Sequence, residues 1–183
     1  MSLPNLSKAD HAKEKIQEAC FAGAHGILVC GLHCIMPERY RTISQLSQEN
    51  KNLSQTDYEV MVIGAGVAGI CQIKKLRDMG ISALVLEAGN GLGGTWYNNR
   101  YPGCRFDSES YTYGFKFSRD LLDEWHWKEM FSPQPENLKY LNFVADKFDL
   151  HQHIRLNAAV AQMEWDEPAR IWTVTLEDGD ELT

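Results

Sequence analysis

Two features that would point to particular classes of protein are missing from this sequence. It lacks a surplus of positive charge, because 18 Lys and Arg residues stand against 25 Asp and Glu, for a net charge of −7. That balance argues against a nucleic-acid partner or an anionic membrane surface. It also lacks an uninterrupted apolar run of the roughly 20 residues that a membrane-spanning helix needs. The most apolar stretch, residues 20–36, contains glycine and histidine and follows acidic residues, which disfavours a transmembrane span or signal peptide.

A cysteine framework is missing as well. The five cysteines are odd in number and irregularly spaced, which favours reduced thiols in the cytoplasm over a set of disulfides. Cys30, His33 and Cys34 lack a second ligand pair at zinc-finger spacing, and His151 with His153 lacks a third ligand. We therefore expect a cytoplasmic protein without a metal site.

The composition changes near Asp57. Residues 7–19 are good helix formers, residues 20–36 predict an apolar helix that ends at Pro37, and residues 38–57 are polar and rich in Ser, Gln and Asn. We interpret residues 1–57 as a helical N-terminal extension and linker, and residues 58–183 as a separate domain.

That domain opens with a predicted strand, helix and strand. Residues 58–63 are an apolar run ended by glycine, residues 67–80 carry apolar side chains at helical spacing up to Gly80, and residues 82–87 are a second apolar run. Such a βαβ unit has parallel strands. The sequence therefore predicts an α/β fold of Rossmann type.

Further helices and strands are predicted downstream of a long loop over residues 88–118. Helices are expected over 119–131 and 134–150, the second with Pro135 in its first turn. Short strands over 153–157, 159–166 and 170–178 predict a small β-layer. Four tryptophans in these segments are expected to be packing residues: Trp125, Trp127, Trp165 and Trp172.

The glycines after the first strand form a dinucleotide-binding motif. Gly64, Gly66 and Gly69 have the G-x-G-x-x-G spacing between a strand and a helix, and Glu87 ends the second strand. These glycines permit the tight turn, the approach of a pyrophosphate and close helix–strand packing, and the helix N-terminus offers N–H groups to phosphate. Glu87 can accept from ribose hydroxyls and repels a 2′-phosphate, which favours FAD or NAD at this turn over NADP.

The loop after Glu87 favours FAD. Glycines let its backbone lie against a cofactor, and aromatic residues supply flat walls for a ring system. Its sequence over residues 87–107, EAGNGLGGTWYNNRYPGCRFD, resembles that of Baeyer–Villiger-type flavin-containing monooxygenases. The resemblance continues over residues 58–183, and residues 1–57 are loosely similar to the extension of the 4-hydroxyacetophenone monooxygenase-like branch.

The resemblance implies an enzyme that uses FAD, NADPH and O₂ to insert one oxygen atom into a ketone, giving an ester or lactone. It implies these cofactor-binding residues: Gly64, Gly66, Ala68 and Gly69 at the pyrophosphate, Glu87 at the ribose, Gly94, Thr95, Trp96, Tyr97 and Asn98 along the middle and flavin end, Asp107 and Tyr113 near the flavin ring, and Val160 at the adenine. Arg105 and Asp107 are the implied catalytic residues. They face the nicotinamide together with Phe106, and the aspartate orients an arginine of the NADP-binding domain.

The sequence departs from this family in three ways. Asn98 stands where many members have Trp and Phe106 where many have Cys, both expected at the rim of the active site, which leaves substrate preference open. The sequence also stops before the next strand of the FAD-binding domain and before the NADP-binding domain. We therefore expect an incomplete domain with an open sheet edge that needs the missing C-terminal part of the same enzyme.

Two alternatives to the monooxygenase interpretation remain open. One is a truncated FAD- or NAD-binding module without catalysis. The other is a different FAD-dependent pyridine-nucleotide oxidoreductase, such as a disulfide reductase-like enzyme, although no C-x-x-C pair lies near the loop.

Overall fold

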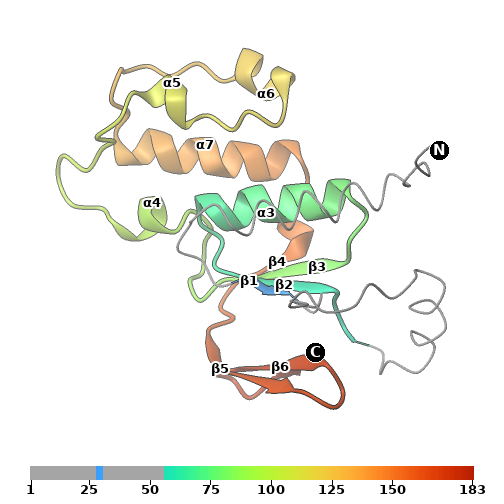
Figure 1. Cartoon of the computed structure of the whole chain (residues 1–183). Coiled ribbons are helices and arrows are strands. Elements are labelled where there is room, and N and C mark those ends of the chain that lie inside the picture. The colour runs from blue at the N-terminus through green and yellow to red at the C-terminus, as the bar shows by residue number, and fades with distance from the viewer. Residues whose placement is uncertain (1–27, 31–55) are drawn as a thin grey trace, which may run out of the picture.

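A central sheet with helices on one face and a second, smaller sheet on the other forms the molecule (Figure 1). The computed structural model describes residues 28–30 and 56–183. The helix and linker predicted for the rest of the N-terminal extension lie outside this part. The predicted α/β fold of Rossmann type is confirmed.

The central sheet has the strand order β1-β2-β3-β4. Strands β2 (Val60–Ile63), β3 (Ala83–Leu86) and β4 (Ile154–Arg155) are mutually parallel, as the predicted βαβ unit requires. All four residues of β3 are buried. Apolar runs without alternation are typical of parallel strands that are covered on both faces.

The strand β1 (Leu28–Cys30) corrects the prediction of a helix over residues 20–36. It pairs antiparallel with β2, with Cys30 opposite Val60. Two causes favour the strand over the helix: glycines at positions 26 and 31 bracket it, and glycine is a poor helix former. The edge of β2 also offers a row of hydrogen-bonding groups that a strand can satisfy and a helix cannot.

Helix α3 (Val67–Asp78) connects β2 to β3 and packs on the sheet. Its buried residues Ile70, Ile73 and Leu76 recur at helical spacing and join the core. The helix ends as predicted at Gly80, whose φ of +71° is readily adopted only by glycine.

Helix α7 (Gln134–Lys147) lies beside α3 on the same side of the sheet and confirms the predicted second helix, with proline in its first turn (Figure 1). Helix α6 (Arg119–Glu124) is shorter than the helix predicted over 119–131. The chain leaves it at Trp125 because the indoles of Trp125 and Trp127 pack on Tyr140 of α7, at centroid distances of 5.2 and 4.9 Å. Both tryptophans are half-buried against the core, which confirms their predicted packing role.

The loop over residues 88–118 contains two short helices that its sequence did not indicate, α4 (Thr95–Asn98) and α5 (Ser110–Tyr113). A 3-10 turn, η2 (His151–His153), precedes β4. These turns of four residues or fewer are too short to show a periodic pattern.

The predicted β-layer is an antiparallel sheet of β5 (Val160–Asp166), β6 (Ile171–Leu176) and β7 (Glu181–Leu182), the last of which was not predicted. It packs under the central sheet through Val174 and Leu176. The indoles of Trp165 and Trp172 contact one another in the β5–β6 hairpin, 5.5 Å apart, and 38% of Trp165 is exposed. These two tryptophans therefore form a surface pair outside the core.

A buried tyrosine connects α7 to the loop before α6. The hydroxyl of Tyr140 accepts a hydrogen bond from the Phe115 N–H at 2.7 Å, and only 1% of Tyr140 is exposed. Burial raises the pKa of Tyr140 to about 12, against the opposing effect of this bond. The phenol therefore stays neutral and keeps its bond to Phe115 throughout the neutral range.

We expect Tyr140→Phe to lower the free energy of unfolding by about 1–3 kcal/mol, because it leaves the Phe115 N–H buried without an acceptor. Urea denaturation measures this change. Tyr111→Phe is the matched control: this ring is 64% exposed, and its loss of a hydroxyl should change stability by less than about 0.5 kcal/mol. Equal effects of the two substitutions would contradict the role assigned to Tyr140.

Candidate cofactor-binding site

The turn between β2 and α3 has the geometry that the glycine motif predicts. Gly64 adopts φ +92° and donates its N–H to the Leu86 carbonyl at 2.8 Å, which joins the ends of β2 and β3. Gly69 lies inside α3 directly against Gly64, and a Cβ at Gly69 would collide with the Gly64 carbonyl oxygen. Helix and strand can therefore approach this closely only with glycine at position 69.

The N-terminus of α3 is suited to an anion. Gly66 is its N-cap and provides no side-chain cap, and the first turn carries no acidic side chain. Ala68 is exposed in that turn. Backbone N–H groups and the positive end of the helix dipole are thus left for a ligand such as a diphosphate.

Glu87 is fixed at the same turn. Its Oε2 accepts from the Ala65 N–H at 2.6 Å and its Oε1 accepts from the Gly89 N–H at 2.8 Å. Each carboxylate oxygen keeps a further lone pair. The side chain therefore points at the glycine turn, oriented by two backbone donors, where it can accept from ribose hydroxyls.

The start of the small sheet lies beside Glu87. Ala158 donates its N–H to the Glu87 carbonyl at 2.8 Å, and Asn157 donates to the Gly89 carbonyl at 2.9 Å. Val160, which begins β5, follows two residues later and is half-buried. The adenine contact expected of Val160 stays a prediction.

A second glycine loop presses against the first. Gly93 donates its N–H to the Ala65 carbonyl at 2.9 Å. Gly94 adopts φ +54°, and a Cβ there would lie 2.9 Å from the Gly66 Cα. The backbones of the two loops therefore face each other with no side chain between them. A dinucleotide in an extended conformation needs such a surface, so the residues present fit FAD.

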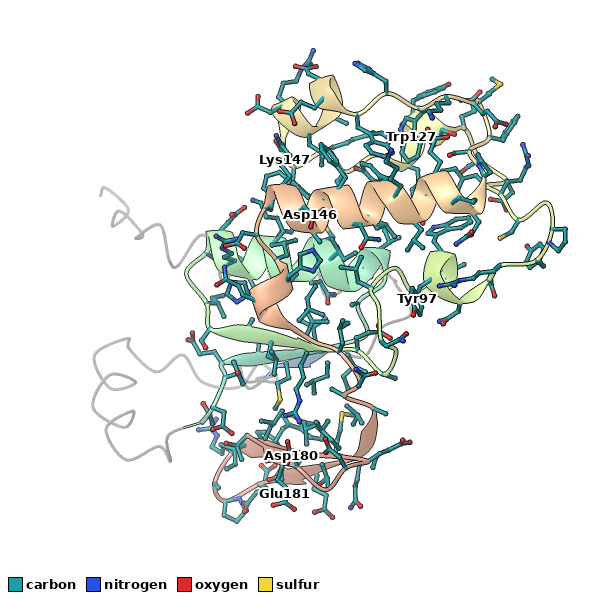
Figure 2. The ribbon with its side chains drawn as sticks, turned by 180° about the vertical axis from the view of Figure 1, so that it is seen from behind. Tyr97, Trp127, Asp146, Lys147, Asp180 and Glu181 are labelled. Carbon is teal, nitrogen blue, oxygen red and sulfur yellow. The ribbon has the colours of Figure 1, made fainter. Side chains whose placement is uncertain are left out.

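Helix α4 follows this loop and holds four of the predicted residues. Thr95 and Asn98 are exposed, while Trp96 is buried. Tyr97 is half-buried and packs on Gly91 at the outer edge of the loop (Figure 2). These residues line one continuous turn directly after Gly94.

Trp96 of α4 belongs to an aromatic cluster that also contains Phe106, Tyr113 and Trp127. The Trp96 Nε1–H donates to the Tyr113 hydroxyl at 2.8 Å, and burial raises the pKa of Tyr113 despite this opposing bond. Phe106 was expected at the rim of the site, and this is wrong: it is 5% exposed. Its ring centroid lies 4.9 Å from Trp96 and 4.1 Å from Tyr113, because burial among aromatic rings outweighs exposure at a rim.

The two predicted catalytic residues lie on the surface next to this cluster. Asp107 is exposed, and Arg105 pairs through Nη1 with Glu129 Oε2 at 3.2 Å and with the Phe131 carbonyl at 3.3 Å. Solvent weakens such an exposed ion pair. The Arg105 side chain therefore points toward Glu129, but little free energy is needed to move it to another partner.

Two residues of the site were not predicted from the sequence. Ala65 uses its N–H for Glu87 and its carbonyl for Gly93, so it ties both loops together. Gln134 of α7 is buried and donates to the Trp96 carbonyl. Ala65 acts only through its backbone groups, so its side chain gives no indication of this role. Gln134 lies 38 residues from its partner, so no local pattern could have indicated it.

The other candidate sites in the described residues are weaker. Among residues 28–30 and 56–183, no group of three metal-binding side chains is present, and His151 instead pairs with Asp146 at 2.8 Å. His33 and Cys34 lie outside these ranges. Nor does the described part contain a helix long and apolar enough to cross a membrane.

An open hollow of about 350 Å³ lies at the far end of α3 from the glycine turn, lined by Lys74, Arg77, Asp78, Lys147, Phe148 and Asp149. Its cations already have partners within the protein. Lys74 pairs with Asp78, and Arg77 donates to the Phe148 carbonyl. We therefore assign it no ligand.

We expect Gly69→Ala to disrupt the turn, lowering the free energy of unfolding by more than about 3 kcal/mol or preventing folding, because the new methyl group collides with the Gly64 carbonyl. Thermal unfolding measures the effect. Gly114→Ala is the control, since its φ is −61° and the nearest atom to a new Cβ lies 3.4 Å away. A Gly69→Ala protein as stable as Gly114→Ala would show that the close approach is not required.

Comparisons with known proteins agree with this geometry. Residues 62–130, which include the glycine turn, Glu87 and α4, match the family model of the NAD(P)-binding Rossmann-like domain. The chain is 46% identical over 125 residues to 2-oxo-Delta(3)-4,5,5-trimethylcyclopentenylacetyl-CoA monooxygenase of Pseudomonas putida, covering 68% of this chain and 23% of the relative. It is 42% identical over 130 residues to acetone monooxygenase (methyl acetate-forming) of Gordonia sp. strain TY-5, covering 71% of this chain and 24% of that relative.

The solved structures that resemble the chain include the crystal structure of OTEMO in complex with FAD and NADP. It superposes with a TM-score of 0.67 at 43% identity, over 70% of this chain and 24% of that one. The chain spans about a quarter of the length of the proteins it matches.

Proposed function

The chain belongs by sequence and fold to the Baeyer–Villiger type of flavin monooxygenases, and on that basis we propose that it is the FAD-binding portion of an NADPH-dependent enzyme that inserts one oxygen atom from O₂ into a ketone, giving an ester or lactone. The observation that carries the proposal is the meeting of two glycine loops beside a fixed carboxylate, at Gly66, Gly94 and Glu87. Relatives named for oxygenation of a ketone such as acetone support the reaction type.

We propose that FAD lies along the edge of the central sheet at which β2 and β3 end. The N-terminus of α3 would hold the pyrophosphate through backbone N–H groups, with Ala68 exposed in its first turn. Glu87 would accept from the ribose hydroxyls, and Val160 would contact the adenine. When bound, the flavin supplies the redox chemistry that activates oxygen, and the protein supplies position and charge.

The residues beyond the second glycine loop would orient the flavin end. Thr95, Tyr97 and Asn98 follow Gly94 directly, and Trp96 anchors their helix by its bond to Tyr113. The tyrosine in turn packs on Phe106. This buried aromatic support lets α4 present a rigid wall, which preorganises a site better than a loop alone.

Arg105 and Asp107 would face the nicotinamide and the rest of the enzyme. Both are exposed on the segment after α4. A carboxylate at Asp107 can orient an arginine from the NADP-binding domain, and such a positioned cation stabilises negative charge during the reaction. NADPH, the ketone and the missing C-terminal part of the enzyme are the partners of this surface.

Two further expectations remain predictions. We propose that the division between the extension (1–57) and the FAD-binding domain (58–183) separates two functional units. We also propose a cytoplasmic location, for which the irregular spacing of the cysteines is the argument. A disulfide reductase-like function gains no support, because the comparisons name monooxygenases.

We expect the 183-residue chain to bind FAD, and Glu87→Gln to weaken this binding roughly tenfold or more, because charge-assisted hydrogen bonds to the ribose contribute about 1.5–3 kcal/mol. Flavin fluorescence during titration with FAD measures the dissociation constant.

Glu59→Gln is the matched control for that substitution. Glu59 also accepts a backbone N–H, from Ser82 at 2.8 Å, but at the opposite end of β2 and β3. Its substitution should leave the dissociation constant for FAD unchanged. A folded chain that does not bind FAD, or equal weakening by both substitutions, would contradict the proposed site.

We expect the chain alone to show no steady NADPH oxidation in the presence of a ketone, measured by absorbance at 340 nm. A chimera in which residues 1–183 are followed by the downstream part of the Gordonia acetone monooxygenase should oxidise NADPH with its ketone, because it supplies the NADP-binding domain. Turnover by the 183-residue chain would refute the expectation that this portion is incomplete.

A further inference from the structure

The ring of Tyr97 lies against the middle of the second glycine loop, which runs over residues 89–94 (Figure 2). A Cβ placed on Gly91 would lie 2.4 Å from the Tyr97 Cε2 and 3.0 Å from its Cζ, and the three atoms nearest to it all belong to Tyr97. Gly91 does not have a positive φ, so the ring rather than backbone strain opposes a side chain there. The loop can therefore follow this course beside the ring only with glycine at position 91.

The polar groups of Tyr97 already have partners within the protein. Its hydroxyl donates to the Oδ1 of Asn90, which belongs to the same loop. Its carbonyl accepts from the Arg100 Nε at 2.8 Å, and the Arg100 guanidinium lies 4.8 Å from the centre of the tyrosine ring, within the range of a cation–π interaction. The ring and the hydroxyl that the family resemblance assigns to FAD are thus engaged by the loop and by Arg100.

The two ends of the second glycine loop are attached to the candidate site. At one end, the Gly89 N–H donates to the Glu87 Oε1 at 2.8 Å. At the other end, the Gly93 N–H donates to the Ala65 carbonyl at 2.9 Å. Between these two attachments the loop rests on the Tyr97 ring. A displacement of the loop at this point would therefore reach both the Glu87 carboxylate and the glycine turn.

We propose that Tyr97 is a positioning residue, which holds the second glycine loop in the shape that binds the dinucleotide, and that its side chain does not itself contact FAD. This inference rests on the proposed function, because it concerns how the affinity for FAD is set. Contacts that fix a loop in its bound shape raise affinity, since less ordering is left to occur on binding. Because the loop is attached to Glu87 at one end and to Ala65 at the other, Tyr97 acts on the adenosine and diphosphate part of the ligand as well as on the flavin part.

The first experiment compares FAD with ADP, which has the adenosine and the diphosphate but no flavin, in the 183-residue chain. We expect Tyr97→Ala to weaken the binding of FAD roughly tenfold and that of ADP by a similar factor, because the loop is no longer held in place. Flavin fluorescence measures the binding of FAD, and competition against FAD measures that of ADP. Weakened FAD binding with unchanged ADP binding would overturn the inference, since it would show that the tyrosine contacts the flavin end.

Two further substitutions separate the ring from the hydroxyl and from tyrosine in general. Tyr97→Phe keeps the ring against Gly91 and should retain most of the affinity for both ligands, because it loses only a solvent-exposed hydrogen bond. Tyr101→Ala is the matched control: this nearby tyrosine is 63% exposed, and its loss should leave both affinities unchanged. Binding by Tyr97→Phe as weak as that by Tyr97→Ala would contradict the role assigned to the ring.

The second experiment is a double-mutant cycle between Gly91 and Tyr97. Gly91→Ala alone should weaken FAD binding roughly tenfold, because the new methyl group displaces either the ring or the loop. Combined with Tyr97→Ala, it should add less than about a further twofold, because the ring with which the methyl group collides is gone. Effects of the two substitutions that multiply would show independent roles and would overturn the inference.

Thermal unfolding verifies that each variant is folded, and Tyr97→Leu, which also removes the ring, replaces Tyr97→Ala with the same expectations if the alanine variant does not fold. The outcomes distinguish this inference from the proposed function. An unmodified 183-residue chain that is folded but does not bind FAD would overturn the proposed site, and this inference with it. FAD binding that Tyr97→Ala leaves unchanged would overturn the inference alone.

Discussion

The backbone of Ala65 is the point on which the candidate site depends. Its N–H binds the Glu87 carboxylate and its carbonyl accepts from Gly93, so one residue joins the end of β2, the end of β3 and the second glycine loop. The neighbouring contacts between Gly69 and Gly64, and between Gly94 and Gly66, require bare backbone. The Glu87 carboxylate, the glycine turn and the second glycine loop, for which we propose contacts to the sugar, the diphosphate and the flavin, are therefore positioned relative to one another largely by main-chain contacts.

The parts of this arrangement that arise from local sequence were predictable. The glycine spacing predicted the turn, and the apolar spacing of Ile70, Ile73 and Leu76 predicted a helix on a sheet. Glu87 was identified because it ends the apolar run over residues 82–87, whose Ala83–Leu86 form the buried strand β3. In each case the information lies within one element or its immediate neighbours, where periodicity and backbone preferences decide the structure.

The features that were missed arise from contacts between distant segments. Trp125 ends α6 because Tyr140 offers a packing surface, and Phe106 is buried because three aromatic rings surround it. Leu28–Cys30 forms a strand because β2 offers it an edge. None of these partners is visible in a local window of sequence, so tertiary packing overrides the local preference.

The two faces of the central sheet pack into two different hydrophobic cores. Val60, Val62 and Val85 pack toward α3 and α7, whereas Met61, Leu84 and Leu86 pack toward the small sheet. Alternate residues of the same two strands thus belong to both halves of the molecule. Loss of either half would expose apolar surface on strands that the other half still needs, which couples the halves into a single cooperative unfolding transition. Partial unfolding is consequently a poor route for releasing the FAD that we propose binds here, since the glycine turn proposed for the diphosphate and Val160, proposed for the adenine, are lost together.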